Sequence, residues 1–287
     1  MEDTNLNNLS NRSMLTTLEI SSWSGRCIDK DISADIINQN MAQKDAGAFT
    51  KRLVNKDALK EISTISNEAR KMHKQLTLSW TDKKARLIPM SLVNEHLTLM
   101  REFQNKQEQA VDNFIINYND CIEEAKGILG QMFNASDYPS EEEVKDKFMF
   151  SFNHEPLPQI DDFRCEIDND LKKVLQENME SNFNDRISKS IKKLWQKIYK
   201  IIKTMHEKLK DENGKFHKTL LGNVQELVNL LPDLNVTNDK ALTEMTEKIQ
   251  NELCIFDIED LRLNKETRQE AVNVSKNILD TMETFYV

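Results

Sequence analysis

The strongest constraint on the fold comes from two stretches, residues 91–133 and 169–210, in which apolar side chains recur at helical spacing and no proline occurs. The chain has only six Gly and five Pro, too few for a turn-dense β-sandwich. In the first stretch the steps are mostly three or four, as one buried helix face requires, at Val93, Leu97, Met100, Phe103, Val111, Phe114, Ile115, Tyr118, Ile122, Ala125, Leu129 and Met132. We therefore predict a mainly α fold, an elongated, coiled-coil-like bundle built on two long antiparallel helices.

Short extended segments interrupt this helical pattern. Residues 76–80 and 86–90 flank a Thr-Asp-Lys-Lys turn and indicate two extended pieces. Residues 148–152 alternate phenylalanine with other side chains, which is strand spacing, and residues 163–167 are the expected partner strand. The sequence thus predicts a small β-hairpin near residues 148–167, capping one end of the helical pair.

Three segments follow along the chain. Residues 1–14 are rich in Asn and Ser and predict a flexible N-terminal tail. Residues 15–212 hold both long helices and the hairpin, and an Asn-Gly stop follows the second helix. Residues 213–287 then carry shorter helical patterns. We predict a tail, a long-helix domain and a C-terminal helical segment.

The composition points to a cytoplasmic protein. No window approaches 18 uncharged apolar residues, and the polar N-terminus lacks the layout of a signal peptide. The cysteines stand singly, without a CxxC pair, so we expect unpaired and mostly buried thiols in a reducing compartment. They are Cys27, Cys121, Cys165 and Cys254.

Sequence signals for catalysis are weak. No GxxxxGK[ST] or GxGxxG phosphate loop and no GxSxG elbow occurs. The histidines show no spacing that places two metal ligands on one helix face; they are His73, His96, His154, His206 and His217. The acidic run 141–143 follows Ser140 and fits the first turn of a capped helix, while the Asp161–Asp162 pair fits a loop. We expect no enzyme activity, no cofactor and no metal site.

The net charge of −9 conceals two opposite regions. Residues 101–185 hold 20 Asp/Glu against 8 Lys/Arg, a net of −12, whereas residues 186–210 hold 9 Lys/Arg against 1 Glu, a net of +8. On a helix, the apolar residues of 186–210 share one arc and most of the basic residues share the opposite arc. This basic face comprises Arg186, Lys189, Lys192, Lys193, Lys197, Lys200 and Lys203.

The basic face has three interpretations. Closely spaced lysines displace counterions from nucleic acid, so it fits a surface that tracks phosphates. It also fits an acidic protein partner. The third interpretation is a solvated face that packs near the protein's own acidic surface, because the chain as a whole is acidic and lysine lacks the planar fork with which Arg reads bases.

Aromatic and proline residues mark the two turn regions. Trp80, Arg86 and Pro89 lie around the first turn, and Tyr138 and Pro139 lie in the second. Such residues serve either as anchors for a partner surface or as plugs that close the end of a helical pair. We favour the structural role.

These turns also carry a resemblance. In order, the chain reads ISSWSGR (20–26), LTLSW (76–80), RLIP (86–89), DYP (137–139) and DFR (162–164). This series resembles an uncharacterised domain family of bacteriophages and plasmids, marked by a TLPW-like turn and RLLP, DYP and DFR motifs.

The resemblance covers roughly residues 15–170 and includes Phe163 and Arg164 of the DFR motif. It departs from the family pattern at Ser79, where proline is more usual, which predicts a less rigid turn before Trp80.

The family has no assigned activity, and its genes often lie near a MoxR-type AAA+ ATPase and a von Willebrand A-like protein. The resemblance therefore implies a non-enzymatic phage or mobile-element scaffold or adaptor in the bacterial cytoplasm, with a AAA+ ATPase, a host factor or a second copy as partner. One alternative is a nucleic-acid-associated protein that uses the basic face. Another is a phage inhibitor of a host nuclease or defence complex, in which the acidic region 101–185 imitates DNA.

Overall fold

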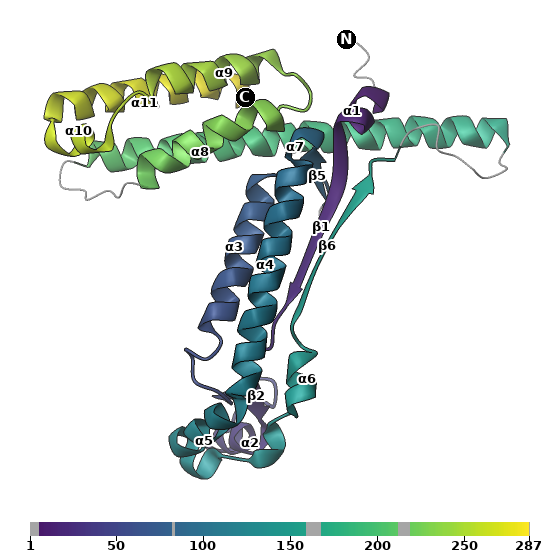
Figure 1. Ribbon diagram of the computed structural model, residues 1–287, viewed down its shortest axis with the longest axis vertical. Helices are drawn as coiled ribbons and strands as arrows, with labels where there is room; N and C mark the ends of the chain where they lie inside the picture. Colours follow the sequence, from purple (N-terminus) through teal and green to yellow (C-terminus); the bar gives the residue numbers. More distant parts are fainter. Residues whose placement is uncertain (1–5, 82–83, 159–167, 212–218, 287) are drawn as a thin grey trace. The chain divides into compact units, whose positions relative to one another are not determined.

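A computed structural model describes residues 6–81, 84–158, 168–211 and 219–286, which form a mainly helical protein with two small sheets (Figure 1). The predicted mainly α class is confirmed. No helix among these residues has an apolar stretch long enough to cross a membrane.

Two compact units interleave along the chain. Unit 1 combines Met1–Thr17, Lys74–His96 and Asn153–Val287, and unit 2 combines Leu18–His73 and Leu97–Phe152. The predicted boundaries after residues 14 and 212 stay a prediction.

The framework of unit 1 is α7 (Asn169–Lys210), with α8 and α11 packed along its C-terminal part (Figure 1). The predicted apolar arc of α7 is buried at Ile187, Leu194, Ile198, Ile202, Met205 and Leu209. Arg268 of α11 closes the end of the helix, because its Nε donates to the Leu209 carbonyl at 2.8 Å and satisfies a carbonyl that has no intrahelical partner. The other helices of the unit are α1 (Leu6–Arg12), α8 (Thr219–Leu234), α9 (Lys240–Glu252), α10 (Ile258–Leu263) and α11 (Lys265–Tyr286).

A four-stranded sheet has the order β4–β5–β1–β6. Strand β5 (Arg86–Pro89) pairs antiparallel with β4 (Leu78–Ser79) and with β1 (Ser13–Ser21). These strands confirm the two predicted extended pieces. Strand β6 (Met149–Pro156) confirms the predicted strand, but its neighbour in this sheet is β1. The expected local partner, 163–167, lies outside the described residues.

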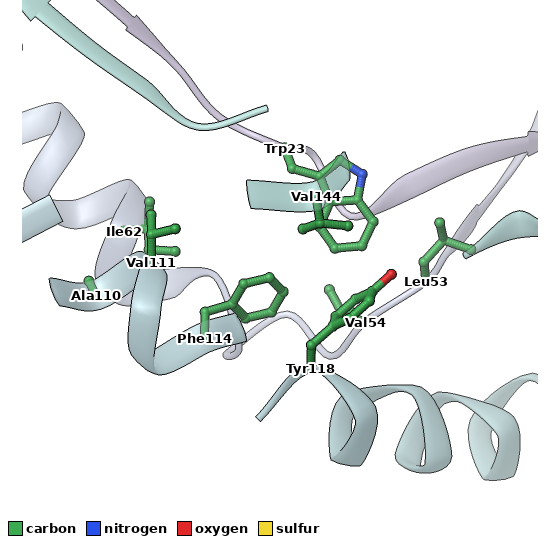
Figure 2. Packing of buried hydrophobic residues seen from close by; sticks show 9 residues of the cluster. All are labelled: Trp23, Leu53, Val54, Ile62, Ala110, Val111, Phe114, Tyr118 and Val144. Carbon is green, nitrogen blue, oxygen red and sulfur yellow. The ribbon is translucent and has the colours of Figure 1, made fainter. Parts of the chain in front are cut away.

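An aromatic cluster forms the core of unit 2 (Figure 2). The Trp23 ring lies edge-on to Tyr118, with centroids 5.8 Å apart, and tilted against Phe114 at 6.1 Å. Gly25 follows Trp23 with φ +62°, and a Cβ there would lie 2.8 Å from Val54 Cγ2. Only glycine fits without strain, both because of the positive φ and because of this close approach.

The long stretch 91–133 forms two helices, α4 (Met90–Ile116) and α5 (Tyr118–Leu129). The prediction of one continuous helix is wrong, and Asn117 shows why. Its backbone N–H donates to Phe114 O, three residues back, and its Nδ2 donates to Asn113 O at 2.7 Å. An asparagine side chain thus takes a carbonyl that the helical ladder would otherwise use.

The remaining elements of unit 2 are short, apart from α3. The helix after Ser140 has the predicted capping box, since Ser140 N donates to Glu143 Oε2 at 2.8 Å and Glu143 N donates to Ser140 Oγ at 3.3 Å. Strands β2 and β3 form a separate two-stranded antiparallel ribbon. The elements are β2 (Arg26–Asp29), α2 (Lys30–Gln39), β3 (Phe49–Arg52), α3 (Lys60–Gln75), the 3₁₀ turns η1 (Gly130–Met132) and η2 (Ala135–Asp137), and α6 (Glu141–Lys145).

Candidate functional site

The LSW segment packs against the basic helix in unit 1. Trp80 is buried and lies edge-on to Phe183 of α7, with ring centroids 5.1 Å apart. The Arg186 guanidinium lies 5.8 Å from the centroid of the Trp80 ring, within cation–π range. One helical turn further on, Ser190 Oγ donates to the Ser79 carbonyl. These contacts support the structural role proposed for Trp80.

Arg86 of the RLIP segment also makes contacts within unit 1. Its Nη2 donates to the Thr77 carbonyl at 3.0 Å and its Nε donates to Thr77 Oγ1, which ties β5 to the segment before β4. Burial lowers the pKa of the Arg86 guanidinium. Pro89 is buried at the end of β5 and pairs with Ser13 of β1. Both residues therefore hold the sheet together.

The structure divides the predicted basic face. Lys193 Nζ donates to Ser79 Oγ at 3.0 Å, and Arg186 covers Trp80. Lys197 is half-buried, and burial together with the nearby Arg86 charge lowers its pKa. The other four residues of the face are exposed and make no contact with the described residues of the β4–β5 segment, and we call them the lysine row: Lys189, Lys192, Lys200 and Lys203.

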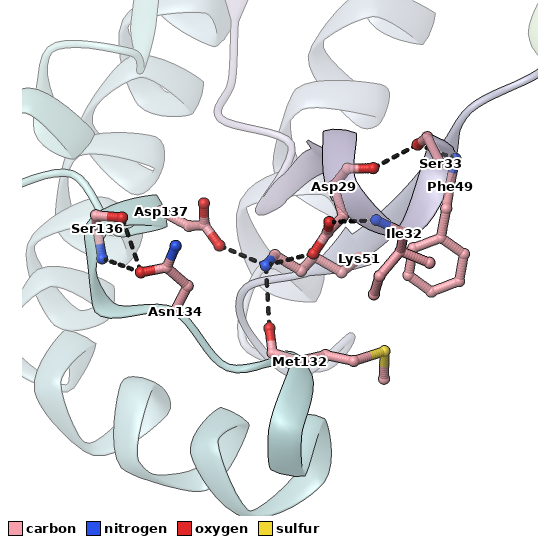
Figure 3. Close-up of polar contacts among 9 residues, drawn as sticks. All are labelled: Asp29, Ile32, Ser33, Phe49, Lys51, Met132, Asn134, Ser136 and Asp137. Atoms are coloured by element: carbon pink, nitrogen blue, oxygen red, sulfur yellow. Dashed lines mark hydrogen bonds and ion pairs between the residues drawn. The ribbon is translucent and has the colours of Figure 1, made fainter. Parts of the chain in front are cut away.

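In unit 2, Lys51 on β3 occupies a buried polar site formed by four separate segments (Figure 3). Its side chain is 5% exposed, and its Nζ lies 2.9 Å from Asp29 Oδ2, 2.6 Å from Asp137 Oδ2 and 3.0 Å from the Met132 carbonyl. Burial opposes the Lys51 charge, but the hydrogen bonds to Asp137 and Asp29 raise its pKa above the ordinary value. Asp137 belongs to the DYP motif, so this motif supplies one wall of the site.

The carboxylate of Asp29 also caps a helix. Its Oδ1 accepts from the Ile32 backbone N–H at 3.0 Å and caps α2. The hydrogen bond from Lys51, followed by that from Ile32, lowers the pKa of Asp29. The arrangement is an ion cluster that joins β2, β3, α2 and the turns after α5.

Tyr138 and Pro139 extend this structural role. The Tyr138 ring packs on Phe133 with centroids 5.4 Å apart, and Tyr118 Oη donates to the Pro139 carbonyl at 3.0 Å. The DYP turn is therefore fastened to both the aromatic core and the ion cluster.

Two histidines that are distant in sequence meet in unit 1. His96 Nδ1 and His154 Nε2 lie 3.0 Å apart, so one ring nitrogen donates to the other. Burial and the neighbouring His154 lower the pKa of His96 to about 4, and burial lowers the pKa of His154 as well. The sequence separates these two histidines by 58 residues, and they meet because β6 lies beside the start of α4 in the folded chain.

Other titratable groups are dispersed. Cys27, Cys121 and Cys254 are free thiols at half-buried rather than fully buried positions, and burial raises the pKa of each, which disfavours the reactive thiolate. Within the described ranges, no group of three or more His, Cys, Asp or Glu side chains is placed to hold a metal ion. Asp161, Asp162, Phe163, Arg164 and Cys165 lie outside those ranges.

Comparison with family models, with curated proteins and with solved structures found no match to this chain. The resemblance therefore stays a prediction.

Proposed function

We propose that this chain is a non-enzymatic scaffold or adaptor from a phage or mobile element that acts through protein contacts. The observation that carries the proposal is uneven packing along α7. Its C-terminal part is covered by α8 and α11, whereas its N-terminal turns extend beyond these helices (Figure 1).

Those first turns carry an apolar row. Leu171 is 49% exposed and Val174 is 52% exposed, while Leu175 and Met179 on the same face are half-buried. The spacing of i, i+3, i+4 and i+8 places all four on one helix face. We call these four residues the apolar row of α7.

An exposed row of this kind suits a protein partner. A helix that buries such a face in a partner's groove gains free energy from each side chain that leaves water. Lys172 on one flank of the row and Glu177 on the other supply the polar rim expected around an apolar contact.

The family resemblance implies the partner to test first, a AAA+ ATPase of the MoxR type. A non-ATPase adaptor is compatible with a sequence that has no nucleotide-binding loop. The antiparallel pairing of the two long helices, α4 and α7, stays a prediction.

The test is affinity capture of the full-length protein from expressing bacteria, followed by reconstitution with the purified candidate. We expect a stoichiometric partner. The double substitution Leu171→Glu and Val174→Glu should weaken binding at least tenfold, because it places two charges in the buried contact.

The matched control is Leu263→Glu with Ile255→Glu, which changes two other exposed apolar side chains by the same charge. This variant should bind as the unmodified protein does. A protein that remains monomeric and captures no partner would overturn the proposal, as would equal loss of binding in both double variants.

A further inference from the structure

We propose that the lysine row of α7, defined above as Lys189, Lys192, Lys200 and Lys203, is a contact surface for the phosphate backbone of double-stranded DNA. This surface is distinct from the apolar row, so the proposal goes beyond the adaptor function and stands without it.

The tertiary structure singles out these four residues from the seven of the predicted basic face. Arg186, Lys193 and Lys197 lie against the β4–β5 segment, which engages part of each side chain, although Arg186 and Lys193 stay exposed. At about 100° per residue, the remaining four fall within an arc of about 80° and extend for about 21 Å along the helix. They form one straight cationic row.

Acidic residues flank the row, but among the described residues none forms an ion pair with it. None of the four ammonium groups lies within ion-pair distance of a described carboxylate, and the acidic residues that flank the row on the helix, Asp185 and Glu207, stand four residues before Lys189 and four residues after Lys203. Lys203 lies 5.9 Å from the centroid of the Tyr199 ring, which leaves its charge in place.

The chemistry of the row favours phosphate over an acidic protein. Protein interfaces are depleted in lysine and draw their energy from aromatic and arginine anchors. The row has neither, since the fifth side chain on its arc is Gln196. Lysine suits phosphate as a compact point charge, and a row of such charges gains from counterion release.

The same composition favours a duplex over a single strand. Proteins that bind single strands stack bases on aromatic side chains. The nearest aromatic residue, Tyr199, is half-buried, and its Oη lies 3.1 Å from Glu283 Oε1 on α11. A backbone contact without base stacking and without arginine forks is independent of sequence, as duplex binding through phosphates requires.

The experiment measures binding of the full-length protein to a labelled duplex DNA of about 20 base pairs by fluorescence anisotropy across a salt series. Four phosphate contacts predict a slope of about −3.6 in a plot of log K against log salt. The variant Lys192→Glu with Lys200→Glu should flatten this slope by about two and weaken binding at low salt at least tenfold.

The control variant, Lys265→Glu with Lys276→Glu, reverses two exposed lysines of α11 and changes the net charge equally. It should keep the original slope and bind within about twofold of the unmodified protein. Circular dichroism confirms that both variants fold.

Absence of DNA binding at low salt would overturn the proposal, as would equal losses in both variants. Tighter binding to a single strand or to duplex RNA would also overturn it, because either result requires contacts that this row lacks. Binding of an acidic protein that survives high salt, without DNA binding, would assign the row to a protein partner instead. None of these outcomes depends on the apolar row, so failure here leaves the adaptor proposal intact.

Discussion

In unit 2, Lys51 is buried between Asp29 and Asp137, whereas in unit 1 the lysine row lies exposed on α7 with no described carboxylate within ion-pair distance. A lysine side chain therefore stabilises the fold in unit 2, whereas lysine side chains in unit 1 remain available for binding. The difference lies in the number of elements that converge on the charge. Three elements besides its own strand contact Lys51, namely β2, η1 and η2, while one helix face carries the row. Burial makes a charge structural, and exposure leaves it free for a partner.

The largest effect should follow from removing the buried cation. Lys51→Met leaves two carboxylates in a site from which water is largely excluded, so we expect the free energy of unfolding to fall by about 3–5 kcal/mol. Urea unfolding monitored by circular dichroism measures this loss.

The matched substitution Lys192→Met on the exposed row should change stability by less than about 0.5 kcal/mol. Equal losses for the two methionine variants would mean that burial does not separate the two kinds of lysine.

A second prediction concerns pH. Because the pKa of His96 is lowered to about 4 in the folded protein, the unfolded chain binds more protons than the folded chain between roughly pH 6.5 and pH 4. Stability should be level above that window and fall as the pH decreases through it.

The variant His96→Gln keeps a polar side chain but cannot titrate. It should reduce the pH slope of the unfolding free energy by up to about 1.4 kcal/mol per pH unit. Urea titrations at several pH values measure this slope. An unchanged slope would show that His96 does not titrate on unfolding.

The smallest effect should come from a charge that lies between these extremes. Arg186 is exposed but covers the buried Trp80, so Arg186→Ala should cost about 0.5–1 kcal/mol through the lost cation–π contact. Lys189→Ala, one turn away and without such a contact, is the control. Identical unfolding curves for the two variants would show that the contact between Arg186 and Trp80 does not stabilise the fold.

Local sequence patterns predicted much of the architecture. The apolar arc of α7, the capping box at Ser140 and Glu143, and the strands around Leu78, Leu87 and Phe150 all follow from spacing and residue type. Each depends on interactions between near neighbours, which periodicity reflects. The break at Asn117 escaped prediction, because a side chain that competes for a helical carbonyl leaves the apolar spacing unchanged.

The sites required long-range information. Nothing in the sequence joins Lys51 to Asp137, or His96 to His154, since these pairs are separated by 86 and 58 residues. The DYP motif and the LSW segment are recognisable in the sequence, but residue spacing does not identify their partners, Lys51 and Arg186. The interleaved units are equally hidden, because each combines segments that are remote in the chain.

The sequence by itself determined the helical class, the amphipathic pattern of α7 and the concentration of positive charge on residues 186–210, because these depend on order along the chain. Only the tertiary structure decided which of those charges remain free. Packing of the β4–β5 segment engaged three members of the basic face and left the lysine row exposed, and packing of β2 and of the turns after α5 against β3 buried Lys51. Whether a charged side chain supports the fold or stays available for binding is set by the elements that surround it.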